Sequence, residues 1–282
     1  MKPREILYTL GFKPRPRAYG FEVGAQDLGQ YGQIEFARWL HPKAYDWRVY
    51  PEEITELRHF LRPGDLCVDV GAHCGDTAAP MGLAVGAEGC VVALEPNRYL
   101  FPVLEENSRL LAERATIVPV MAAATPEPGT YTFGYSDPGF CNGGDDHKLT
   151  WWRRRRMFPL EVTGLRLEEL LREQYADRLD RLRYIKTDTE GNDLELLKSI
   201  RGLLADCRPF LRVEVYRFCP ADYRAELHRY LTELGYSVHA TNSISDLAGP
   251  ELSADGVVTM GHGDVFCIPS EAATEAVTDR AA

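Results

Sequence analysis

The residues best suited to chemistry lie in one short stretch, where two glycines and two carboxylates follow apolar runs. An apolar run at 66–70 contains Asp69 and is followed by Gly71 and Gly75. Glycines in a turn between a strand and a helix let a ligand approach the backbone, and the helix offers free N–H groups. Glu95 closes a second apolar run twenty residues after Gly75, where a carboxylate can accept hydrogen bonds from both hydroxyls of a ribose. The spacing predicts a nucleoside site on a strand, turn, helix and strand.

Asp69 indicates which nucleoside is bound. In the dinucleotide fingerprint G-x-G-x-x-G, a glycine at this place lets the backbone approach a pyrophosphate. A buried carboxylate would repel a pyrophosphate, whereas it suits S-adenosylmethionine, which carries an ammonium, a sulfonium and no phosphate. The motifs DVGAHCG at 69–75 and ALEPN at 93–97 resemble class I S-adenosylmethionine-dependent methyltransferases.

Small residues end the next apolar run, TIVPVMAAA at 116–124, and would let an adenine ring lie close to the backbone, although tight packing is an equal alternative. The cofactor-binding candidates are therefore Asp69, Gly71, Ala72, His73, Gly75, Thr77, Glu95, Pro96, Asn97, Ala122 and Ala123.

A second pair of carboxylates, Asp188 and Glu190, lies at the end of another strand, before a turn at Gly191. In open α/β sheets, ligands bind beyond the carboxyl ends of the strands, so this pair is expected in the same crevice as Glu95. The pair could bind an acceptor hydroxyl, remove its proton, or hold a divalent ion such as Mg²⁺. His147 is an alternative base because an imidazole titrates near neutral pH.

The neighbouring acids Asp193 and Glu195 need have no role in binding or catalysis. Both lie at the expected start of a helix, where the helix dipole favours negative charge.

The segment that contains Asp188 and Glu190 narrows the resemblance to one family of methyltransferases. IKTDTEGNDLELLK at 185–198 is similar to the signature I-K-x-D-x-E-G-x-D/E-x-E-x-L-K of FkbM-type methyltransferases, with Asn192 and Asp193 where an aromatic residue and glutamate are commoner. The resemblance implies O-methylation of a hydroxyl on a sugar, a polysaccharide or an antibiotic precursor. Two alternatives remain: a catalytically silent binding module built on the cofactor fold, and an NAD-dependent oxidoreductase, which Asp69 disfavours.

The order of elements predicts an α/β fold. We expect a doubly wound, mostly parallel, seven-stranded Rossmann-like sheet with helices on both faces and an antiparallel edge strand. A helix over 100–111 is expected to turn Asn107 toward a wetter side.

Three regions are distinguished along the chain. Residues 1–48 are expected to form an N-terminal arm, which either covers the cofactor cleft or packs outside the sheet. Residues 49–270 form the methyltransferase domain, and residues 271–282 form a flexible tail. An inserted loop at 136–158 is a candidate substrate lid, since its Trp151, Trp152 and four arginines at 153–156 offer aromatic faces and cations. The alternative is an exposed basic turn.

Composition limits the partners. The formal net charge of −10 argues against nucleic acid, and no apolar run is long enough to cross a membrane. The seven cysteines form no C-x-x-C pair, and the N-terminus has no signal-peptide core, which favours a reducing, cytoplasmic location. We expect a small-molecule hydroxyl acceptor as the partner, and a homo-oligomer remains open.

Overall fold

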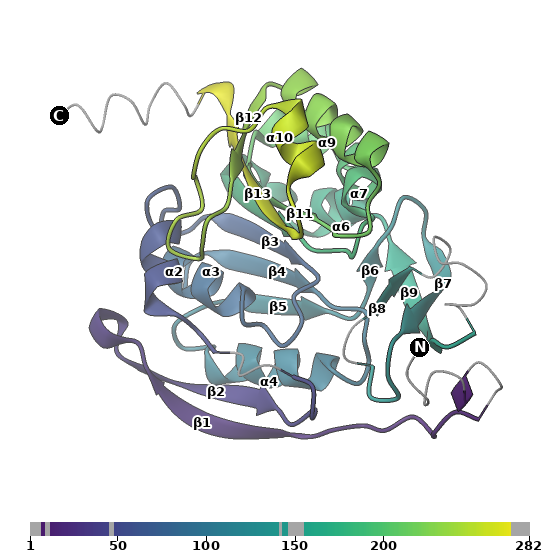
Figure 1. Ribbon diagram of the computed structural model, residues 1–282. Helices are drawn as coiled ribbons and strands as arrows, with labels where there is room; N and C mark the ends of the chain where they lie inside the picture. The colour runs from purple at the N-terminus through teal and green to yellow at the C-terminus, as the bar shows by residue number, and fades with distance from the viewer. Residues whose placement is uncertain (1–6, 9–11, 45–47, 141–142, 146–154, 272–282) are drawn as a thin grey trace.

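The computed structural model of this 282-residue chain describes residues 7–8, 12–44, 48–140, 143–145 and 155–271 (Figure 1). Its centre is a seven-stranded sheet. In spatial order the strands are β12 (Tyr236–Ala240), β13 (Gly263–Pro269), β11 (Phe210–Val215), β10 (Leu182–Thr187), β3 (Leu66–Val70), β4 (Cys90–Leu94) and β5 (Ile117–Val120).

The central strands are buried on both faces, so they read as nearly continuous apolar runs. All five residues of β3 and of β4 are buried, which is typical of parallel strands covered by helices on both sides. Strands β5, β4, β3, β10 and β11 run parallel, and β13 is antiparallel to both β11 and β12. The predicted fold class is confirmed, with one difference. The reversed strand lies one place in from the edge, because β13 inserts between β11 and β12.

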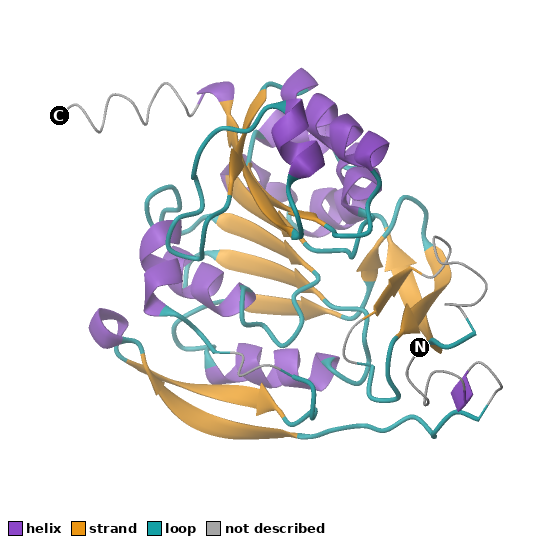
Figure 2. Ribbon diagram, viewed as in Figure 1, coloured by secondary structure: helices purple, strands orange, loops and turns teal. Residues whose placement is uncertain are grey.

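Helices cover both faces of the sheet, as Figure 2 shows. One face packs against α2 (Pro51–Leu57), α3 (Ala78–Val85) and α4 (Phe101–Leu110). The other packs against α6 (Leu167–Gln174), α7 (Asp193–Ser199), α8 (Arg201–Cys207), α9 (Ala221–Glu233) and α10 (Ala254–Thr259). Short 3-10 turns occur at η1 (Gly29–Tyr31) and η3 (Ala176–Arg181). The core therefore consists of two apolar layers on either side of one sheet.

A second sheet stands opposite the carboxyl ends of β3, β4 and β5 (Figure 1). Its strands, in spatial order, are β6 (Ala123–Ala124), β9 (Phe158–Leu165), β7 (Gly129–Tyr135) and β8 (Gly143–Asp145). The strand expected over 116–124 is thus divided: β5 belongs to the main sheet and β6 to the second. The chain bends between them at Met121 and Ala122, which carries Ala122 and Ala123 to the space between the two sheets.

The N-terminal arm forms a two-stranded antiparallel sheet from β1 (Phe21–Asp27) and β2 (Gln33–Trp39). Strand β2 packs against α4, on the outside of the helix layer (Figure 1). These two strands therefore lie outside the helix layer, and Trp39 of β2 also contacts the ring of His73 in the predicted cofactor turn.

Asn107 on α4 fixes this packing, and the expectation that it faces a wetter side is wrong. Its side chain is 1% exposed. The side-chain oxygen accepts from the Ala37 N–H at 2.6 Å, and the amide nitrogen donates to the carbonyls of Ala37 and Cys74 at 3.0 and 2.7 Å. A buried amide is tolerated because its donors and acceptor are all used, which the helical period alone cannot reveal.

The cysteines of the described residues are free, and four of them are buried: Cys67, Cys74, Cys90 and Cys267. Among the helices of the described ranges, none is long and apolar enough to cross a membrane.

Candidate active site

The space between the two sheets contains a cavity of about 720 Å³. This volume lies within the range of small-molecule sites, and its place beyond the carboxyl ends of the strands is the one predicted from the sequence. The predicted cofactor residues in its lining are Gly71, His73, Thr77, Glu95, Pro96, Asn97, Ala122 and Ala123. The predicted pair Asp188 and Glu190 also lines it, whereas Asp69, Ala72 and Gly75 lie behind the wall.

Gly71 begins the turn after β3 and has no room for a side chain. Its φ is +80°, and a Cβ atom there would overlap the carbonyl oxygen of Asp188. The N–H groups of Gly71 and Ala72 both donate to the Leu94 carbonyl, at 3.0 and 2.9 Å. Gly71 therefore lets the turns after β3 and β10 touch, which joins the cofactor motif to the Asp188 turn.

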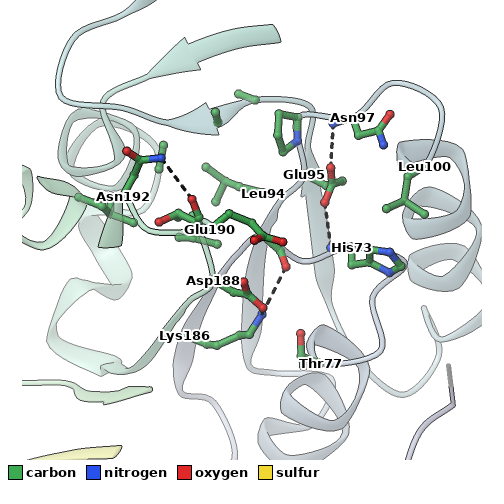
Figure 3. Close-up of a pocket in the computed structure, with 18 of the residues that line it drawn as sticks. His73, Thr77, Leu94, Glu95, Asn97, Leu100, Lys186, Asp188, Glu190 and Asn192 are labelled. Atoms are coloured by element: carbon green, nitrogen blue, oxygen red, sulfur yellow. Dashed lines mark hydrogen bonds and ion pairs between the residues drawn. The ribbon is translucent and has the colours of Figure 1, made fainter. Parts of the chain in front are cut away.

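Glu95 orders the loops on both sides of it (Figure 3). One carboxylate oxygen accepts from the His73 N–H at 3.0 Å and the other from the Asn97 N–H at 2.8 Å. Burial raises the pKa of Glu95 to about 7. Because a carboxylate oxygen has more than one lone pair, each can also accept from a ligand hydroxyl.

Asn97 lines the cavity but uses its amide within the protein. The amide nitrogen donates to the Phe140 carbonyl at 2.7 Å, and the oxygen accepts from the Tyr99 N–H at 3.0 Å. The rings of Tyr99 and Phe140 stack with centroids 4.6 Å apart. Asn97 thus ties the cofactor loop to the start of the inserted loop.

Asp69 is fully buried, and its charge has a partner that sequence reasoning missed. One oxygen accepts from the Thr77 hydroxyl at 2.6 Å, and the other lies 3.5 Å from Lys186 Nζ. Lys186 is itself buried and lies 3.5 Å from Asp188 (Figure 3). The carboxylate of Asp69 is therefore not an open counter-charge for a ligand, as the sequence suggested, but one end of a buried chain of charges.

A signal for this chain was present in the sequence. Asp69 and Lys186 each interrupt an apolar strand, and a buried charge requires a partner. They are register partners on the adjacent strands β3 and β10, which only strand pairing reveals.

The Asp188 turn has a strained backbone. Glu190 is in the left-handed region with φ of +56°, and Gly191 follows with φ of +97°. The Glu190 N–H donates to a carboxyl oxygen of Glu214 at 2.9 Å, at the end of β11. Glu214, a second residue given no role from the sequence, therefore holds this turn.

Burial and like charges perturb this group of carboxyls. The pKa of Glu190 is raised to about 7, first by burial and then by Asp188. The pKa of Glu214 is raised well above its usual range by burial and by the charges of Asp188, Asp193 and Glu190. Glu214 is therefore a neutral acid at pH 7, while Glu190 is poised to exchange a proton near neutrality.

The two other acids of this segment differ from each other. Asp193 is fully buried and accepts from the Thr189 N–H at 3.3 Å, so it shapes the turn before α7. Glu195 lines the cavity. Both acids lie in the first turn of α7, as predicted, and in addition one shapes the turn and the other faces the cavity.

Ion pairs also line the cavity. Arg212 is bonded to Asp264 at 2.6 Å and to Glu53 at 3.3 Å, and all three line it. These groups were also missed, because they come from β11, β13 and α2, far apart in the sequence.

The predicted metal role of Asp188 and Glu190 finds no support. Among the described residues, the group of three or more potential ligands close enough to share an ion is His73, Cys74 and Asp76. Asp188 instead faces Lys186. His147 and residues 151–154 of the Trp-Arg run lie outside the described residues.

The fold and the site together define an S-adenosylmethionine-dependent methyltransferase: a mostly parallel sheet with one reversed strand, a glycine turn after β3 and an acid after β4 beside one cavity. The model of the methyltransferase FkbM domain matches residues 69–238, so the chain belongs to the FkbM methyltransferase family. The family excludes the NAD-dependent oxidoreductase considered from the sequence.

The comparison with solved structures gives matches at low sequence identity. A methyltransferase FkbM from Methylobacillus flagellatus KT is 16% identical, with a TM-score of 0.44 over 73% of this chain and 44% of that chain. This chain therefore corresponds to less than half of that protein's length. Aeropyrum pernix fibrillarin, solved with natively bound S-adenosyl-L-methionine, is 12% identical with a TM-score of 0.41 over 90% of this chain and 95% of that chain. No curated protein matches the chain.

Proposed function

We propose that the chain is an O-methyltransferase that moves the methyl group of S-adenosylmethionine to a hydroxyl of a small molecule, either a sugar or a secondary-metabolite intermediate of the antibiotic type. The observation that carries this proposal is a single cavity that contains both Glu95, on the cofactor side, and Glu190, a carboxyl with a pKa near 7. Donor and acceptor would meet there without an intermediate carrier.

The residues present fit the donor. Both Glu95 oxygens are held in place by backbone N–H groups, with lone pairs left for the ribose hydroxyls. Ala122 and Ala123 offer small side chains beside them for a flat base. The bound donor supplies an electrophilic methyl group whose leaving group is a neutral thioether.

The protein then has three tasks. The cavity aligns the acceptor oxygen with the methyl carbon and excludes water. The carboxylate of Glu190 takes the hydroxyl proton, because its pKa near 7 leaves it substantially ionised at neutral pH and still basic. Asp188 binds the acceptor at the same turn, where its carboxylate lies 3.5 Å from Lys186 Nζ. No metal is assigned a role.

The nature of the partner follows from charge and cavity. A net charge of −10 disfavours polyanionic substrates such as nucleic acid, and a cavity of about 720 Å³ suits a small molecule.

The test begins with calorimetry of the purified chain and S-adenosylhomocysteine. Binding should be tight in the wild type and weaker by about tenfold or more in Glu95→Ala, because two backbone N–H groups lose their acceptor. Glu233→Ala, an exposed acid on α9 at the surface, is the matched control.

Activity is then read as a gain of one methyl mass in a panel of hydroxylated metabolites. If calorimetry detects no binding heat with S-adenosylmethionine or with S-adenosylhomocysteine, the proposal is wrong. Binding without formation of S-adenosylhomocysteine from any acceptor would instead favour a silent binding module.

A further inference from the structure

A row of aromatic side chains lines the cavity on the side opposite the main sheet. Tyr131, Phe133 and Tyr135 alternate along β7, and all three belong to the lining. Alternate residues of a strand share one face, so the row is continuous. The intervening Thr132 faces the other side of the second sheet.

The row is held rigidly. The Tyr131 hydroxyl donates to the Glu127 carbonyl at 2.8 Å, and the Tyr131 ring occupies the space that a Cβ on Gly164 would need. Tyr135 is 4% exposed and packs edge-on against Phe140 with ring centroids 5.4 Å apart. Phe133, between them, is only half-buried and presents its ring to the cavity.

The polar groups on the other side of the same cavity come from the turn after β10. Asp188 and Glu190 lie there, near Asn192 (Figure 3), and Glu195 also lines the cavity. Tyr135, Glu95 and Glu190 line the same cavity, so this end of the row shares it with the donor residues and the proposed base.

We infer that β7 is the platform for the acceptor, and that the acceptor is a saturated ring bearing several hydroxyls, with one C–H face against Phe133 and its hydroxyls toward Glu190 and Asp188. This inference rests on the proposed function and deepens it, since it assigns the acceptor site and the shape of its ligand.

The chemistry of the two walls selects this class of ligand. An aromatic face attracts polarised C–H groups and shields them from water, but offers no partner to hydroxyls. Carboxylates and amide oxygens accept hydrogen bonds from hydroxyls and offer nothing to an apolar face. A cyclic polyol presents both kinds of surface at once, whereas an acyclic polyol has no fixed apolar face and would pay more conformational entropy on binding.

The test measures ligand contact directly by saturation-transfer NMR, with S-adenosylhomocysteine present at saturation. The probes are methyl α-glucopyranoside, methyl α-galactopyranoside and, as the acyclic control, sorbitol. The variants are Phe133→Leu, which keeps an apolar side chain in the same place but removes the ring, and Thr132→Ala on the opposite face of β7. Thermal unfolding checks that both variants are folded, and calorimetry measures S-adenosylhomocysteine binding in each.

The expected result is saturation of ring C–H protons of a pyranoside in the wild type and in Thr132→Ala, reduced about fivefold in Phe133→Leu, with no saturation of sorbitol. Affinity for S-adenosylhomocysteine should be the same in all three proteins. Equal saturation in Phe133→Leu and the wild type, no pyranoside contact in the wild type, or equal contact with sorbitol would each overturn the inference.

A loss of S-adenosylhomocysteine affinity confined to Phe133→Leu would also overturn it, because the row would then contact the donor. These results are distinct from a failure of the proposed function, which would appear as wild-type protein that does not bind S-adenosylhomocysteine. Pyranoside contact that depends on Phe133 would support the platform even then.

Discussion

The carboxyl of Glu214 holds the backbone of Glu190, whose N–H donates to it at 2.9 Å. Glu190 has a positive φ of +56°, a conformation that is unfavourable for a residue with a side chain and needs support from its surroundings. Under the proposed function, Glu214 is therefore a positioning residue, which would act on the reaction through Glu190.

Replacing Glu214 should show whether it acts as a hydrogen-bond acceptor for the Glu190 backbone or as a charged group. Glu214→Ala removes the acceptor for the Glu190 N–H and is expected to lower kcat by roughly 10-fold to 100-fold, with the KM for S-adenosylmethionine unchanged. Glu214→Gln should retain most of the activity, because an amide closely resembles the neutral acid that the raised pKa of Glu214 implies. Steady-state kinetics of both variants provides the measurement. Equal losses in Glu214→Ala and Glu214→Gln would argue for a charged or directly catalytic Glu214.

Asp188→Asn should affect turnover and not donor binding. Asp188 is 43% exposed in the cavity and pairs with Lys186, so the substitution removes a charge at the acceptor side while keeping the shape of the turn. We expect kcat to fall about tenfold or more, with S-adenosylhomocysteine affinity within about twofold of the wild type by calorimetry. Asp206→Asn, an exposed acid on α8, is the control. A parallel loss of both quantities would place Asp188 in the donor site.

The pH profile of kcat should report Glu190. Its pKa is raised to about 7 by burial and by Asp188, while Tyr216 and Arg217 act in the opposite direction. Since the deprotonated form accepts the proton, kcat should rise with pH and level off above about pH 8. Glu190→Gln should abolish this acid limb together with most of the activity. If the limb persists in Glu190→Gln and disappears in His147→Ala, His147 is the base.

Gly71→Ala should destabilise the protein. The position has φ of +80° and no space beside the Asp188 carbonyl, so we expect a loss of more than about 2 kcal/mol in the free energy of unfolding. For a domain of this size, this corresponds to a fall in Tm of about 4 to 8 °C, measured by circular dichroism. Gly24→Ala on β1, where no atom lies within 4 Å of an added Cβ, should leave Tm nearly unchanged. Similar melting of both variants would contradict the close approach of the two turns.

Stability should decrease as the pH rises from 6 to 8. Burial raises the pKa values of Glu53, Glu95, Glu190 and Asp193 to about 7. The folded state therefore holds protons that the unfolded chain, with the usual pKa values of 4.5 for glutamate and 3.8 for aspartate, has already released. Stability therefore falls with rising pH through this window.

His73 opposes this trend, but only at lower pH. Its pKa is lowered to about 4 by burial, so its effect is confined below about pH 6.5. Thermal unfolding at pH 6 and pH 8 should give the higher Tm at pH 6. A higher Tm at pH 8 would show that these carboxyls are ionised in the folded protein without cost.

The sequence alone determined the family, the alternation of strands and helices in the main sheet, and the carboxyl ends of β3, β4 and β10 as the candidate site. These features depend on neighbours along the chain: an apolar run sets a buried strand, and glycine and an acid after it set a turn. Gly71, Glu95, Asp188 and Glu190 could therefore be found from spacing.

Only the tertiary structure decided which charged side chains become partners and which side chains line the opposite wall of the cavity. Asp69 and Lys186 became partners because β3 and β10 are adjacent in the sheet, and Asn107 was buried because β2 folds back onto α4. The aromatic row of β7 reached the cavity because the chain leaves the main sheet after β5 and builds a second sheet opposite it. Which strands pair, and which side chains a remote segment buries, depend on the free energy of the whole fold. No local pattern in the sequence therefore specifies them.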